Sequence, residues 1–115
     1  MLYLFDQHAA LFRSWEVTRY EQEGNAYLLH VSVLMQDGSR LEIRDYLFVD
    51  QTRKYAYQWM EEEGALRRRW DNAPHWPDIA TSPHHVHLPN QVEPEPSTIT
   101  NLEELFIFLR DWYEL

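Results

Sequence analysis

Residues 27–49 read YLLHVSVLMQDGSRLEIRDYLFV, and this stretch decides the fold class of the chain. Residues 27–35 are β-branched and apolar, whereas residues 40–49 alternate between apolar and polar side chains. Between them stands Asp37-Gly38, a pair that favours a tight hairpin turn because glycine adopts positive φ without strain. The stretch therefore predicts two antiparallel strands joined by a short turn.

Further strands are expected on both sides of this hairpin, so that strands occupy residues 15–71. Upstream, residues 15–23 follow a period of two and end at the turn pair Gly24-Asn25. Downstream, residues 54–61 predict a fourth strand and residues 66–71 a fifth. Successive strands linked by short turns are typical of an antiparallel meander.

Two helices are expected to flank these strands. Over about residues 2–14, apolar and aromatic side chains recur at helical steps, namely Leu4, Phe5, His8, Leu11, Phe12 and Trp15. Near the other end, Thr100-Asn101-Leu102-Glu103 resembles a capping box and begins a helix predicted over 101–113. All six prolines lie in residues 72–99, which predicts a Pro/His-rich loop.

The expected fold is α+β, with one domain over residues 1–115. It consists of a single twisted antiparallel sheet of about five strands, with both helices packed on one face. Hydrophobic residues make up 44% of the 115 positions, enough for a core and unlike a disordered composition.

The charge and cysteine content limit the possible functions. Nineteen acidic residues against ten basic ones give a net charge of −9, which argues against broad, non-specific binding of nucleic acid. No cysteine is present, which excludes disulfides, thiolate metal sites and cysteine nucleophiles. The opening residues lack a signal-peptide pattern, and no apolar run reaches the roughly 18 residues of a membrane span. We expect a cytoplasmic protein that does not enter a membrane.

The chemically informative residues lie in 64–89, which holds three arginines and four of the six histidines. If residues 67–71 form a strand, Arg67, Arg69 and Asp71 share one face. In the same way, His85 and His87 project together from an extended segment, with His84 opposite.

These side chains are compatible with three roles. First, His75, His85 and His87 could transfer protons in metal-independent RNA cleavage, with Arg69 holding the phosphate and Asp71 orienting a partner. Second, the three histidines with Asp71 have the ligand types of a metal site, although His-x-His alone is a weak signal. Third, the whole segment could be structural.

Residues beside these could contact a substrate. The aromatic rings of Tyr57, Trp59 and Trp70 could stack on bases, with Arg67 and Asn72 nearby. The alternative is that the rings pack in the core beneath a helix and that Asn72 shapes a turn.

The same residues carry a family resemblance. The pattern Tyr55-x-Tyr57-x-Trp59, then the run from Arg69 to His75, then Thr81-x-Pro83-x-His85-x-His87 resembles the TumE-type toxins, short prokaryotic proteins of type II toxin–antitoxin modules. The upstream run Asp37-Gly38-Ser39-x-Leu41-x-Ile43-Arg44-Asp45-Tyr46 is similar as well, so the resemblance covers about residue 15 to the end.

The resemblance implies a growth-inhibiting toxin encoded beside a DNA-binding antitoxin, commonly a helix-turn-helix protein. It supplies no catalytic residues, so ribonuclease activity without a cofactor remains an inference from side-chain chemistry. A non-enzymatic toxin or defence protein acting through protein contacts, or a metal-dependent nuclease, stays an alternative. The acidic charge suits a basic antitoxin segment. The edge strands of a meander could also pair in a homodimer.

Overall fold

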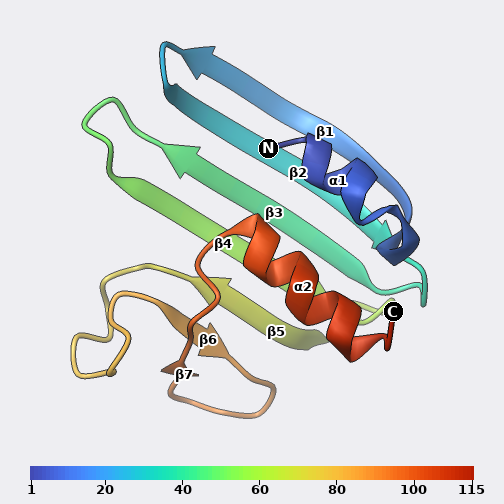
Figure 1. Ribbon diagram of the computed structural model, residues 1–115. Coiled ribbons are helices and arrows are strands. Elements are labelled where there is room, and N and C mark those ends of the chain that lie inside the picture. The colour runs from blue at the N-terminus through green and yellow to red at the C-terminus, as the bar shows by residue number, and fades with distance from the viewer.

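The computed structural model describes residues 1–115 and contains one seven-stranded antiparallel sheet whose strands follow one another in chain order (Figure 1). The strands are β1 (Phe12–Glu23), β2 (Ala26–Met35), β3 (Arg40–Leu47), β4 (Arg53–Met60), β5 (Leu66–Asp71), β6 (His85–His87) and β7 (Glu95–Pro96). Helix α1 (Tyr3–Gln7), a 3-10 turn (Ala9–Leu11) and helix α2 (Leu102–Trp112) complete the chain. The predicted antiparallel meander of the α+β class is confirmed.

Alternation along the central strands separates a buried face of the sheet from an open face. The buried face consists of side chains at most 2% exposed, among them Leu29, Val31, Val33, Leu41, Ile43, Tyr55, Tyr57 and Trp59. Both helices add apolar side chains to this same core, including Phe5 of α1 and Phe106 of α2. Figure 1 shows both helices on one side of the sheet, so the other side is left without a helical cover. Neither helix has the length and apolar character needed to cross a membrane.

The predicted N-terminal helix over residues 2–14 is wrong beyond its first turns. Helix α1 ends at Gln7, and β1 already begins at Phe12 instead of residue 15. Phe12 and Trp15 fit the helical stripe by spacing, yet they lie opposite Met35 and Val33 in the ladder with β2. Pairing along a long hairpin supplies backbone hydrogen bonds and a buried face at once, and this tertiary gain overrides the local helical pattern.

The predicted loop over residues 72–99 contains two further strands, so the sheet has seven strands and not about five. In β6, His85 lies opposite Asp71 and His87 lies opposite Arg69. Strand β7 is only two residues long and includes Pro96, which is tolerated because β7 is an edge strand. The added pairing places the histidine segment directly beside β5.

Helix α2 begins and ends within one residue of the predicted range. The side chain of Asn101 accepts a hydrogen bond from the Glu104 N–H at 2.9 Å, and Glu104 accepts one from the Thr100 N–H at 3.0 Å. The bond to Asn101 satisfies a backbone donor that the first turn leaves free, so the N-cap is Asn101 with Glu104 and not the predicted Thr100 with Glu103. The Arg53 guanidinium donates to the Thr100 carbonyl at 2.7 Å and to the buried Asp45 carboxylate at 3.0 Å. Arg53 therefore ties the start of the helix to the sheet.

Candidate active site on the open sheet face

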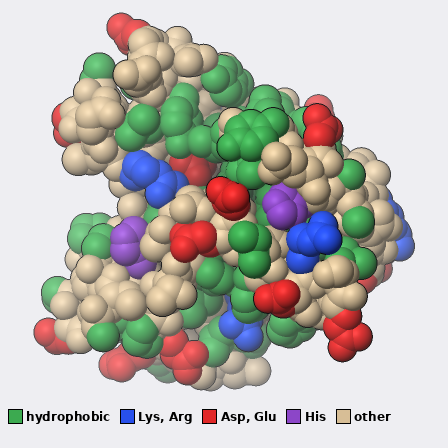
Figure 2. All heavy atoms as spheres, in the orientation of Figure 1, with side chains coloured by type: hydrophobic (Ala, Val, Ile, Leu, Met, Phe, Trp, Pro, Cys, Tyr) green, Lys and Arg blue, Asp and Glu red, His purple; other side chains and the backbone are tan.

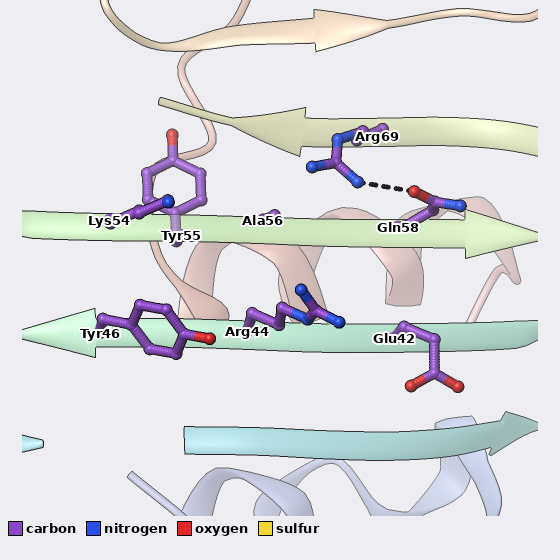
Figure 3. Close-up of a pocket in the computed structure, with 8 residues that line it drawn as sticks. All are labelled: Glu42, Arg44, Tyr46, Lys54, Tyr55, Ala56, Gln58 and Arg69. Atoms are coloured by element: carbon purple, nitrogen blue, oxygen red, sulfur yellow. Dashed lines mark hydrogen bonds between the residues drawn. The ribbon is translucent and has the colours of Figure 1, made fainter. Parts of the chain in front are cut away.

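The open face of the sheet carries a cleft of about 390 Å³ over strands β3, β4 and β5. Figure 3 views it from the side opposite the helices, which lie behind the strands. The lining residues are Glu42, Arg44, Tyr46, Lys54, Tyr55, Ala56, Gln58 and Arg69. Most of the lining side chains stand at outward positions of these three strands, among them the short Ala56, whereas the inward positions fill the core.

The cleft is locally basic in a chain whose net charge is −9. Arg44, Lys54 and Arg69 line it, and Glu42 is the one acidic side chain among the lining residues. On the helix-covered face, by contrast, basic and acidic side chains are scattered among one another (Figure 2). A cluster of cations on one concave surface attracts an anionic ligand even when the whole protein is acidic.

Asp71 is the centre of a polar cluster at the border of this cleft. Its side chain is 7% exposed. One carboxylate oxygen, Oδ1, accepts a hydrogen bond from the Ala73 N–H at 3.0 Å and lies 2.8 Å from His85 Nε2. The other oxygen, Oδ2, accepts from Arg69 Nε at 3.2 Å and lies 3.5 Å from His87 Nε2. A nearly buried carboxylate therefore contacts two imidazoles and one guanidinium.

His85 is held between two acceptors. Its Nδ1 lies 2.9 Å from the Pro83 carbonyl oxygen, which can only accept, so Nδ1 carries a hydrogen and donates. Its Nε2 faces the Asp71 carboxylate, and a hydrogen bond there requires a second proton on the pair. The ring is 2% exposed. His85 and Asp71 thus face each other at hydrogen-bond distance, away from solvent.

His87 is the accessible imidazole of the cluster. Its side chain is 28% exposed, and its ring lies edge-on to the ring of His85 with centroids 4.9 Å apart. Burial lowers the pKa of His87, and the positive charges of His85 and Arg69 lower it further, whereas Asp71 opposes them. The lowered pKa keeps this imidazole neutral at neutral pH, the form that accepts a proton.

Arg69 connects the cluster to the cleft. Its Nη1 donates to Gln58 Oε1 at 2.7 Å, the bond drawn in Figure 3, while its Nε bonds Asp71. The side chain is 40% exposed, so part of the guanidinium still faces solvent. An arginine that is fixed on two sides and open on a third is suited to hold a phosphate oxygen.

The structure brings together four of the five predicted catalytic residues and leaves out the fifth. His85, His87, Asp71 and Arg69 lie on the open face in register. His75 is exposed in the loop after β5 and lines a separate hollow with Trp76 and Glu93. The predicted opposite placement of His84 is also found, because its Nδ1 bonds the Tyr55 hydroxyl at 2.8 Å.

The rings predicted to contact a substrate are buried in the core. Tyr57 and Trp59 are 0% exposed and Trp70 is 1% exposed, and Trp70 packs between Trp59 and Phe108 of α2. No ring face is free to stack on a base, so the core-packing alternative fits this placement.

Arg67 and Asn72, also predicted to contact a substrate, have structural partners. A register shift between Trp59 and Met60 removes Arg67 from the face of Arg69, and Arg67 instead bonds Glu61 at 2.7 Å and Asp37 at 2.8 Å. The expected shared face for Arg67 is therefore wrong. The Asn72 side chain accepts from the Tyr55 N–H at 3.0 Å and donates to the Arg53 carbonyl at 2.9 Å, which extends the β4–β5 ladder.

Of the cations that line the cleft, Arg69 was predicted as a site residue, whereas Arg44 and Lys54 were missed. Arg44 and Lys54 stand at outward positions of β3 and β4, where a charged side chain is ordinary. The available signal was that two neighbouring strands both carry cations at outward positions, on the face that the predicted packing of both helices on one side leaves open.

Asp71, His85 and His87 also have the donor types of a metal site. One ligand atom from each lies within 4.8 Å of the other two. In a tetrahedral zinc site with bonds near 2.0–2.1 Å, however, ligand atoms lie about 3.3 Å apart. The 2.8 Å between Asp71 Oδ1 and His85 Nε2 is a hydrogen-bond distance, and Arg69 already occupies Oδ2. As arranged here, the cluster fits shared protons better than a cation.

Fold and site together define a small α+β protein whose open antiparallel sheet face carries an imidazole–carboxylate–guanidinium cluster beside a basic cleft. A family model described as Toxin TumE matches residues 1–113, and the chain therefore belongs to the TumE toxin family. The match extends the resemblance to the N-terminal segment that precedes residue 15. No curated protein and no solved structure matches the chain.

Proposed function

We propose that this protein is the toxin of a toxin–antitoxin module and that it inhibits growth by cleaving RNA without a metal ion. The observation that carries the proposal is the contact of Asp71 with His85, His87 and Arg69 at the border of a basic cleft. Membership of the TumE toxin family supports the toxin role. The chemistry of the cluster supports the reaction.

In the proposed reaction, the RNA backbone lies in the cleft, where Arg69 contacts a phosphate oxygen and Arg44 and Lys54 attract the neighbouring phosphates. His87 Nε2–H faces the Asp71 carboxylate, so the other ring nitrogen, Nδ1, takes the proton of the adjacent 2′-hydroxyl. That oxygen forms a bond to phosphorus, the bond to the 5′-oxygen breaks, and this oxygen takes a proton from water. The products carry a 2′,3′-cyclic phosphate and a 5′-hydroxyl.

Asp71 and His85 are positioning residues in this scheme. The carboxylate of Asp71 is nearly buried and orients both His87 and Arg69, and His85 supports it from the interior. A cation at Arg69 and a neutral His87 can then face the same phosphodiester. His75 has no part in the reaction, because it lies in another hollow.

The partner of such a toxin is proposed to be an antitoxin of the helix-turn-helix DNA-binding type. The net charge of −9 supports this assignment, since a basic segment of a DNA-binding protein would be attracted to the acidic surface outside the cleft. Binding over the open face would also block access to the cluster.

The test is induced expression of the wild type and of His87→Ala, with growth followed and new RNA 5′ ends mapped by their chemistry. The matched control is His75→Ala, an exposed imidazole outside the cluster. We expect arrest and 5′-hydroxyl ends with the wild type and the control, and neither with His87→Ala. Growth arrest by His87→Ala with the same RNA cuts would overturn the assignment of His87. Growth arrest by the wild type without any new RNA ends would overturn RNA cleavage and would mean that the toxin acts by binding.

A further inference from the structure

The two edges of the sheet differ in how exposed they are to pairing with another chain. The edge at β7 is two residues long and includes Pro96, which has no N–H to donate. The edge at β1 is twelve residues long, and every side chain after Phe12 is exposed or half-buried. A long unpaired edge strand presents free backbone N–H and C=O groups that another strand can pair with.

Strand β1 carries pairs of complementary side chains that lie symmetrically about its midpoint, between Val17 and Thr18. Glu16 and Arg19 lie opposite Ser32 and His30 of β2, and these positions put both on the open face. Trp15 and Tyr20 lie opposite the core residues Val33 and Leu29, which puts both on the helix-covered face. A register shift between Val17 and Arg19 places one extra residue in β1. Glu16 and Arg19 are therefore three residues apart in the chain and still lie on the same face.

We propose that β1 pairs antiparallel with β1 of a second copy of this chain, with Glu16 opposite Arg19 of the other copy. By the two-fold symmetry, Arg19 is then opposite the second Glu16, so two ion pairs form on the open face. The same register places Trp15 opposite Tyr20 twice on the other face. Opposite charges and aromatic pairs directly across strands each stabilise pairing.

One neighbouring register is disfavoured by charge. Moving the second strand by two residues would set Glu16 opposite Glu21, a like-charge contact on the same face. The aromatic rings are already exposed for the contact, because Trp15 is 38% exposed and Tyr20 is 49% exposed. Trp15 is also held in place by stacking on Phe5 at 4.5 Å between centroids. Within one chain, Arg19 pairs only with Glu21, and both side chains are at least half exposed.

The arrangement has a structural consequence. A two-fold axis between antiparallel strands of one sheet runs perpendicular to the sheet, so both open faces lie on the same side. Two copies therefore form one continuous sheet with their clefts facing the same way. This inference rests on β1 alone and does not depend on the proposed RNA cleavage.

The experiment is light scattering on the purified chain after size exclusion, over a wide range of protein concentration. We expect the wild type to reach twice the single-chain mass of 14.0 kDa. The single variants Glu16→Arg and Arg19→Glu each place like charges across the interface, so each alone should stay at the single-chain mass. Mixed together, the two single variants restore both opposite-charge pairs and should form a dimer of one copy of each.

The control is Arg13→Glu, a charge reversal in the same strand at the register shift between Phe12 and Ser14, outside the proposed ion pairs. It should dimerise as the wild type does, and circular dichroism checks that every variant is folded. A wild type that is monomeric throughout would overturn the proposal, and so would a dimer that both charge reversals leave intact. Pairing of β1 only with a different protein would overturn it too.

Discussion

Asp71 and His85 face each other across neighbouring strands, with the carboxylate Oδ1 2.8 Å from the imidazole Nε2. The other ring nitrogen already donates to the Pro83 carbonyl at 2.9 Å, so the pair must hold an additional proton to bond at all. In contrast to His85, the neighbouring His87 reaches solvent. The Asp71–His85 pair therefore lies in the interior, while His87 beside it can contact a ligand.

The first prediction concerns the charge of Asp71. Its carboxylate opposes the burial and the two cations that lower the pKa of His87. Replacing it in Asp71→Asn should therefore lower the pKa of His87 further. The measurement is a pH titration of the His87 ring resonances by NMR in both proteins.

A matched control for this titration is Glu42→Gln, which removes an acidic side chain from the cleft without touching the cluster. It should leave the His87 titration in place. A pKa of His87 that stays the same or rises in Asp71→Asn would show that Asp71 does not act on this ring.

The second prediction concerns the buried carboxylate of Asp45. It accepts hydrogen bonds from Arg53, Tyr57 and Tyr27. Burial and the Asp45 charge raise the pKa of Tyr27 to about 12, so this hydroxyl keeps its proton even in mildly alkaline solution. The change Asp45→Asn leaves the Arg53 charge without its partner and should lower the free energy of unfolding by about 3 kcal/mol.

The milder variant Tyr27→Phe removes one bond to Asp45 and should cost about 1 kcal/mol. Urea denaturation measures both changes. Equal effects of the two variants would mean that the pairing of Asp45 with Arg53 adds nothing to stability.

The third prediction is a loss of stability in mildly acidic solution. Burial lowers the pKa of four histidines, His8, His30, His84 and His87. Below a pH of about 6.5 the unfolded chain binds protons that the folded chain does not, so folding stability falls as the pH falls from there towards the lowered pKa values. Above that pH the stability from these groups is fully present.

Urea midpoints measured from about pH 7.5 down to about pH 5.5 should therefore decrease steadily. The variant His84→Gln removes one of the four groups, and its midpoint should depend less on pH than that of the wild type. A midpoint that is constant or rises over this range would contradict the prediction.

The fourth prediction concerns metal removal. The Asp71 carboxylate is bonded to His85 and Arg69 at hydrogen-bond distances. RNA cleavage by the purified protein should therefore persist after treatment with a chelator, and the ends should remain 5′-hydroxyls. Activity that disappears with the chelator and returns with one divalent metal would instead assign Asp71, His85 and His87 as ligands.

The central hairpin was predictable because its pattern satisfies several local rules at once. Alternating side chains, β-branched residues and the Asp37-Gly38 turn all favour strands, and Gly38 has the expected positive φ of 87°. The start of helix α2 was readable to within one residue for a similar reason, since a cap involves residues only three apart, although the cap is Asn101 with Glu104 and not Thr100 with Glu103. The prediction of a helix over residues 2–14 failed because Phe12 and Trp15 fit both a helical spacing and the buried face of a strand. Pairing with β2 decides for the strand.

For the site, the sequence by itself determined the chemistry of the residues and, through strand alternation, that Arg69 shares a face with Asp71 and His85 with His87. Only the tertiary structure decided that β6 pairs with β5, which brings those two faces together and leaves His75 outside. It also decided that Trp70 faces the core and that Arg44 and Lys54 line one cleft with Arg69. Local patterns fix which way a side chain points from its own strand, whereas contacts between distant segments depend on which strands pair and where the helices pack.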